Sequence, residues 1–160
     1  MAKTGYTAVT GGTSPAAVAL TAATRKTVLG VKGHANFGVD LTGFWCDFDG
    51  VTASALPVLV EVCYCTWATN GPGTNSTTIT PLQEYGRVTA VGATAAKTWT
   101  AEPTVLTVLR AFQLDPNKGL FSYDYPLGQT PDSAVAEGFA LVFTAPAAVN
   151  VFAGIRFERA

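Results

Sequence analysis

The sequence predicts an all-β fold, a single-domain antiparallel β-sandwich of the jelly-roll kind with an extended N-terminal arm. Several stretches of its 160 residues alternate apolar and polar side chains with a period of two, as half-buried strands do. Short segments rich in Gly, Pro, Asn and Asp separate these stretches at the spacing of a sandwich or barrel. No stretch has convincing helical periodicity, and the alanine-rich residues 90–96 have room for one short turn only. The Cys–Trp–Cys spacing of immunoglobulin domains is absent, which favours the jelly roll.

Residues 1–24 are rich in Ala, Thr and Gly and are weakly patterned. They predict an N-terminal arm or an edge strand with a flexible joint. The sandwich domain itself is expected over residues 25–160, a length that suits one domain with a single core.

The first clear strands are residues 26–32 and 37–48, with a turn at residues 33–36 between them. Strict alternation in the second strand puts four apolar side chains on one face: Phe37, Val39, Leu41 and Trp45. The opposite face then carries Asp40, Thr42, Phe44 and Cys46. A tight turn is expected at residues 47–50, where Asp-Gly supplies the positive φ angles that a reversal needs.

Residues 58–67 form the strongest strand, which is apolar on both faces except at Glu61. Such a strand is expected in the middle of a sheet that is covered on both sides. Glu61 is then explained by a buried ion pair with Arg110 or Arg156 as well as by a catalytic role. Residues 70–76 have the composition of a surface loop.

The second half of the chain has the same pattern of strands separated by turns. Residues 104–114 alternate as a strand, residues 115–119 form a turn with Pro, Asn and Gly, and residues 120–126 form a short aromatic strand. Residues 138–144 and 150–157 are predicted as two antiparallel strands, which residues 145–148 connect.

Composition argues against several classes of function. The net charge is −1 and the Lys and Arg residues are scattered, which argues against nucleic-acid binding. The N-terminal residues lack the apolar core of a signal peptide, and no apolar stretch is long enough to span a bilayer as a helix. We therefore expect a protein made soluble in the cytoplasm, with no membrane partner.

Chemically reactive groups are few. The chain has one histidine, His34, in a predicted turn, whereas an enzyme usually needs a cluster of tuned titratable groups. The three cysteines lack the paired spacing of a zinc site and are expected to be small buried apolar groups: Cys46, Cys63 and Cys65. Asp47 and Asp49 share a turn, but a calcium site would need further ligands and a hydrolase pair has less support still. We therefore predict no enzyme activity, no cofactor and no metal.

The tryptophans allow one alternative. Trp45 and Trp67 lie in strongly apolar strands and are expected in the core, whereas Trp99 lies between two threonines and can face outward. An outward Trp99 would suit a carbohydrate-binding β-sandwich module or a host-attachment domain. A cupin-type enzyme is the third alternative, and a single histidine argues against it.

Several turn-and-strand motifs occur along the second half of the chain: Thr80-Pro81-Leu82-Gln83, Gly86-Arg87, Gly92-Ala93-Thr94-Ala95-Ala96, Ala101-Glu102-Pro103-Thr104-Val105-Leu106, Pro116-Asn117-Lys118-Gly119-Leu120, Tyr125-Pro126-Leu127-Gly128 and Ala145-Pro146-Ala147-Ala148-Val149-Asn150-Val151. With these motifs, about residues 25–160 resemble small virion proteins from tailed phages of actinobacteria. In that family the carbohydrate-binding alternative would be a module of a phage tail or host-attachment protein. The resemblance implies a capsid decoration protein that binds the outer surface of a phage head as a trimer. Its partners would be the major capsid protein and other copies of itself, and its location the virion surface.

Residues 1–24 match this family least. On the decoration hypothesis, three aromatic side chains are candidates for contacts with the lattice or between subunits: Phe121, Tyr123 and Tyr125. The alternative, which we leave open here, is that they fill the interior of the sandwich.

Overall fold

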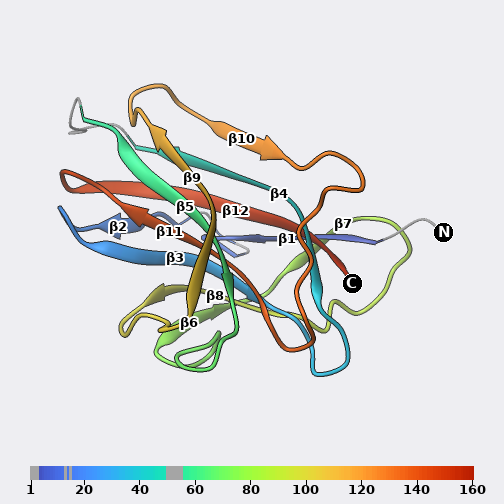
Figure 1. Ribbon diagram of the computed structural model, residues 1–160. Helices are drawn as coiled ribbons and strands as arrows, with labels where there is room; N and C mark the ends of the chain where they lie inside the picture. Colours follow the sequence, from blue (N-terminus) through green and yellow to red (C-terminus); the bar gives the residue numbers. More distant parts are fainter. Residues whose placement is uncertain (1–3, 13, 15, 50–55) are drawn as a thin grey trace.

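Two antiparallel sheets of six strands each form the molecule (Figure 1). The structure, a computed structural model, describes residues 4–12, 14, 16–49 and 56–160. Sheet A contains β1 (Gly5–Val9), β2 (Val18–Leu20), β4 (Val39–Phe48), β7 (Leu82–Tyr85), β10 (Phe121–Asp124) and β12 (Val149–Arg159). Sheet B contains β3 (Arg25–Lys32), β5 (Val58–Cys65), β6 (Ser76–Ile79), β8 (Thr94–Trp99), β9 (Leu106–Leu114) and β11 (Gly138–Thr144).

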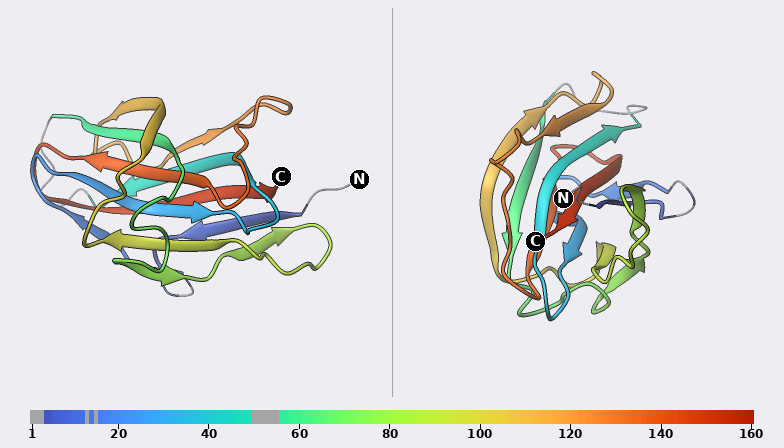
Figure 2. Two further views of the ribbon diagram at one scale, coloured as in Figure 1. Left: turned by 60° about the horizontal axis from the view of Figure 1, so that its bottom comes forward. Right: turned by 90° about the vertical axis from the view of Figure 1, so that its right-hand side faces the viewer.

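The connectivity of eight strands is that of a jelly roll. In sheet A the order β1–β12–β4–β10 faces the order β3–β11–β5–β9 of sheet B. Among these eight strands only β5 and β9 follow each other in the same sheet, and every other step along the chain passes from one sheet to the other. The predicted sandwich is therefore confirmed, and Figure 2 shows it from two further directions.

The chain between β5 and β9 adds three strands to this framework. β8 and β6 extend sheet B beyond β3, and β7 extends sheet A beyond β1, on the side of the molecule opposite to β9 and β10 (Figure 2). The alanine-rich residues 90–96 hold no helical turn, because from Thr94 onward they pair with β3 and β6. Ala95 is buried in the main core and Ala96 in a second cluster on the opposite face of sheet B.

The N-terminal segment supplies two strands of sheet A. β1 lies between β12 and β7, and its side chains Tyr6 and Ala8 are buried in the core. β2 pairs with the other end of β12. Over the described residues, most of this segment is therefore part of the sandwich and not a free arm. In the sequence, the alternation of Tyr6 and Ala8 is too short to predict a strand among the surrounding Thr and Gly.

A β-bulge at Thr42 overturns the predicted faces of β4. Gly43 pairs with Arg156, but Leu41 pairs with Phe157, so Thr42 is an extra residue. The bulge shifts the alternation by one position, and Phe44 therefore joins Leu41 in the core. Trp45, predicted in the core with Leu41, lies on the outer face of sheet A instead. The turn predicted at residues 47–50 does not begin at Asp47, because Asp47 and Phe48 still pair with β12 as the end of β4. Gly50 lies outside the described residues.

The last two predicted strands do not pair with each other. β11 pairs with β3 and β5 in sheet B, whereas β12 pairs with β4, β1 and β2 in sheet A. Residues 145–148 therefore cross from one sheet to the other. Both strands are apolar enough to need neighbours on both sides, which a simple hairpin would not provide.

Two apolar cores stabilise the sandwich. The main core fills the space between the sheets, and a smaller one covers the outer face of sheet B around Trp67 and Trp99. The two indole rings stack with centroids 5.8 Å apart and planes 13° from parallel. Their Nε1 groups donate to backbone oxygens of Val31 and Asn70. The middle of sheet B is thus covered on both faces, as predicted for β5, which lies between β11 and β9, whereas β9 itself is largely exposed.

Candidate functional site

The sequence-predicted reactive residues make separate local contacts. His34 is exposed, as expected, and stacks on Phe37 with ring centroids 5.3 Å apart. Asp47 accepts a hydrogen bond from the backbone N–H of Phe48, and Asp49 accepts one from the side chain of Asn150. Within residues 4–49 and 56–160, as far as they are described, no three His, Cys, Asp or Glu side chains come together as metal ligands. Nor does any helix in that part have the length and apolar character to cross a membrane.

Glu61 pairs with Arg25, not with the predicted Arg110 or Arg156. Arg25 Nε donates to Glu61 Oε2 at 2.7 Å, across the strand β11 that separates β3 from β5. The carboxylate raises the pKa of the Arg25 guanidinium. The side chain of Glu61 is 12% exposed, so the ion pair explains why an acid is tolerated in this apolar strand.

The three cysteines are free thiols and are buried, as predicted. Burial raises the pKa of Cys46 and of Cys63 to about 12, and it also raises the pKa of Cys65. Thiols with such pKa values are protonated at neutral pH and are poor nucleophiles. They act as small core side chains.

Sheet B ends at an exposed apolar strand, β9, which we call the β9 edge together with Val105. In the described part of the chain β9 pairs on one side only, with β5. Its exposed aliphatic side chains are Val105, Val108 and Leu109, each a little over 40% exposed. A register shift opposite Val62 and Cys63 makes Leu109 the extra residue of a second bulge. Because a bulge interrupts the row of backbone donors and acceptors, the β9 edge is suited to side-chain contacts more than to strand addition.

The strand β10, which carries aromatic residues, lies beside the β9 edge on the same flank of the molecule (Figures 1 and 2). Phe121 and Tyr123 are half-buried and pack against Phe112 of β9, with ring centroids 5.2 and 5.6 Å apart. Tyr125 is 7% exposed and belongs to the main core. These three residues therefore fill the margin of the sandwich, and a role for Phe121 and Tyr123 in contacts with partners stays a prediction.

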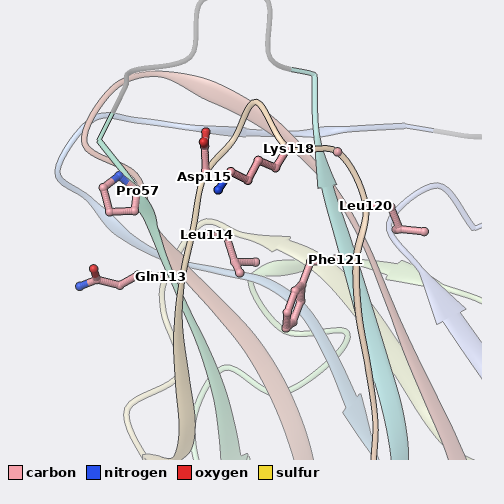
Figure 3. A pocket seen from close by; sticks show the side chains of 8 residues that line it. Pro57, Gln113, Leu114, Asp115, Lys118, Leu120 and Phe121 are labelled. Carbon is pink, nitrogen blue, oxygen red and sulfur yellow. The ribbon is translucent and has the colours of Figure 1, made fainter.

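The turn between β9 and β10 encloses a hollow of about 380 Å³ (Figure 3). Leu114 and Phe121 line its inner part, while Asp115 and Lys118 lie at the turn itself. The hollow joins the β9 edge to β10, so one flank of the molecule offers an apolar strand, aromatic side chains and a recess.

Trp99, expected to face outward, is 2% exposed and stacks on Trp67. Its Nε1 donates to the backbone oxygen of Asn70, and the Asn70 side chain donates to the backbone oxygen of Glu102, which joins the loops after Trp67 and Trp99 beside the ring. Trp45 is the partly exposed tryptophan instead. The bulge in β4, which turns Trp45 outward, is a feature that residue patterns did not reveal.

Comparisons with known proteins add no relative. No protein-family model, no curated protein and no solved structure matches this chain.

Proposed function

We propose that the protein is a structural virion protein that decorates the outer surface of a tailed-phage head and binds the major capsid protein as a trimer. The observation that carries this proposal is the β9 edge, an exposed apolar strand at the margin of a rigid sandwich. The resemblance of the turn-and-strand motifs to small phage virion proteins supplies the identity of the partner.

The β9 edge has the character of a contact surface. Long edge strands with exposed apolar side chains are hazards in soluble proteins, and contiguous apolar patches often mark interaction sites. Here Val108 and Leu109 are consecutive in β9 and Val105 precedes Val108 by three residues, while the recess under the turn between β9 and β10 lies at the other end of the strand, at Gln113 and Leu114. A partner that covers this flank would bury apolar area without needing a reactive group.

A decoration protein also benefits from stiffness and repetition. The two sheets share one continuous core, and the second core holds the long insertion against sheet B. Three copies in a trimer would multiply weak contacts with the shell through effective concentration. The aromatic margin of β10 would then add to contacts between subunits or with the lattice.

Co-sedimentation with phage heads that lack the decoration protein tests the proposal. We expect the wild-type protein to pellet with heads and to saturate, and native mass spectrometry to show a trimer. Val108→Lys and Leu109→Lys should each weaken binding at least tenfold, because a charge is placed in an apolar contact. Val88→Lys is the matched control, since Val88 is 92% exposed in the loop after β7 and lies away from β9.

Two outcomes of these experiments would contradict the proposal. A wild-type protein that stays in the supernatant would refute the decoration function. Normal binding by both β9 variants would refute the assignment of this surface. Circular dichroism of each variant checks that the fold is retained.

A further inference from the structure

The outer face of sheet A carries large side chains that lie on outward-facing glycines. A Cβ atom at Gly154 would meet the indole of Trp45 at 2.2 Å, and a Cβ atom at Gly5 would meet the ring of Tyr85 at the same distance. Trp45 and Gly154 are direct partners across β4 and β12, and Gly5 pairs with Tyr85 across β1 and β7. Because glycine has no side chain, the rings of Trp45 and Tyr85 lie directly against the backbone of sheet A. The outer face of the sheet is therefore flat there and carries aromatic and polar groups.

A shallow depression of about 460 Å³ is formed on this face. Six residues line it: Trp45, Glu84, Leu120, Ser122, Asp124 and Arg156. Its volume lies in the range of small-molecule sites, roughly 300–1,000 Å³. The lining combines one flat aromatic ring with several hydrogen-bonding groups on strands of a rigid sheet.

The polar groups are held in place by one another. Arg156 forms an ion pair with Asp124 and its Nη2 group also donates to Ser122 Oγ at 3.4 Å. Gly43 lies beneath the ion pair, since a Cβ there would meet both Asp124 and Arg156. Glu84 is the extra residue of a bulge in β7, because Gln83 pairs with Tyr6 while Tyr85 pairs with Gly5. Bulges often redirect a side chain toward a site.

From this geometry we propose that the depression binds a neutral pyranose sugar. The apolar C–H face of a pyranose ring matches the open face of the Trp45 indole, which is a large flat apolar surface with a polar edge. The sugar hydroxyls match the carboxylates of Glu84 and Asp124 and the guanidinium of Arg156, which make strong charge-assisted hydrogen bonds. Planar stacking fixes the ring, and the polar groups select its hydroxyl pattern.

The charge of the depression selects against acidic sugars. Glu84 and Asp124 carry two negative charges and Arg156 one positive charge, so the lining has a net charge of −1. Arg156 is already paired with Asp124 and is not free to neutralise a sugar carboxylate. A sialic acid or uronic acid would therefore meet repulsion, whereas a neutral hexose would not.

A glycan array probed with the purified, fluorescently labelled full chain tests the proposal. We expect binding to one or more glycans with an exposed neutral hexose and none to glycans that end in sialic or uronic acid. Trp45→Ala and Glu84→Gln should each reduce the signal at least tenfold, whereas Trp45→Phe should retain part of it because an aromatic face remains. Trp99→Phe is the matched control, since this tryptophan is buried in the second core.

Nuclear magnetic resonance locates the site independently of stability. The chain has three indole N–H groups, and two of them donate to backbone oxygens in the second core. Titration with the methyl glycoside of the array's best hexose should shift the Trp45 indole signal and leave the other two in place. The proposal is overturned if the array shows no binding, if binding survives in a folded Trp45→Ala protein, or if the Trp45 signal does not move. None of these results bears on binding to phage heads by the β9 edge.

Discussion

Replacement of Gly30 by alanine would test the second core directly. Gly30 faces outward from β3, beneath the stacked indoles of Trp67 and Trp99. A Cβ atom there would lie 2.5 Å from Cη2 of Trp67 and 2.9 Å from Cη2 of Trp99. Neither ring can move freely, because they stack on each other and each donates a hydrogen bond to the backbone.

The expected cost follows from these contacts. Forcing an extra methyl group into a packed core costs typically about 1–3 kcal/mol. A Gly→Ala change also restricts the unfolded chain, which offsets about 0.4–1 kcal/mol of that cost. We therefore expect Gly30→Ala to lower the free energy of unfolding by about 1–2 kcal/mol, or the Tm by roughly 2–8 °C for a chain of this size.

Guanidinium denaturation monitored by circular dichroism measures this change. An unchanged m value would show that the native and denatured states of the variant are as compact as those of the wild type. Gly71→Ala is the matched control. Its Cβ would meet Trp67 only at ordinary contact distances of 3.4 Å and more, so stability should be unchanged or slightly increased. The near-ultraviolet spectrum of the tryptophan pair should change in Gly30→Ala only. If Gly30→Ala proved as stable as Gly71→Ala, the account of the second core would be wrong.

Three further predictions concern charged and titratable groups. Arg25→Ala should lower the free energy of unfolding by about 1–2 kcal/mol, because the mostly buried Glu61 loses its partner; a loss below about 0.5 kcal/mol in urea denaturation would argue against a structural role for this pair. The three thiols should not react with Ellman's reagent at pH 8 until denaturant is added, and a thiol that reacts fast in the native protein would contradict their burial. The pKa of Tyr85 is raised from 10 to about 12, first by burial and second by the hydrogen bond that Tyr85 donates to Glu158 at 2.8 Å. Because the folded-state pKa is the higher one, its stabilising effect should be complete below pH 10 and lost as the pH rises through about 12. The difference in ultraviolet titration between wild type and Tyr85→Phe should show this midpoint, and a midpoint near 10 would refute it.

Strand-length apolar patterns between turn residues predicted the sandwich, some alternating, as in β9, and some apolar on both faces, as in β5. β3, β5, β9 and β11 appear in the sequence nearly at their observed bounds. The strands that were missed are short or built from small and polar residues, such as β6 with Ser and Thr and β8 with two alanines. These strands form because a neighbouring strand offers backbone partners, which a local pattern does not contain.

The candidate surfaces were harder to predict for a physical reason. A single bulge at Thr42 exchanges the faces of β4, and it thereby sends Trp45 outward while Phe44 enters the core. The burial of Trp99 depends on the loop that contains Trp67, far away in sequence. The partner of Glu61 is set by the strand order, which brings β3 within reach of β5 across β11. Each of these facts depends on tertiary contacts between distant segments.

The glycine positions beneath Trp45, Tyr85 and the Arg156–Asp124 pair have a consequence for how this protein can vary. Positions on the outer face of a sheet ordinarily accept many residues, yet Gly5, Gly43 and Gly154 are buried under neighbouring side chains, and any side chain there would displace one of them. A deep mutational scan should therefore find that these three positions on the outer face of sheet A do not tolerate substitution.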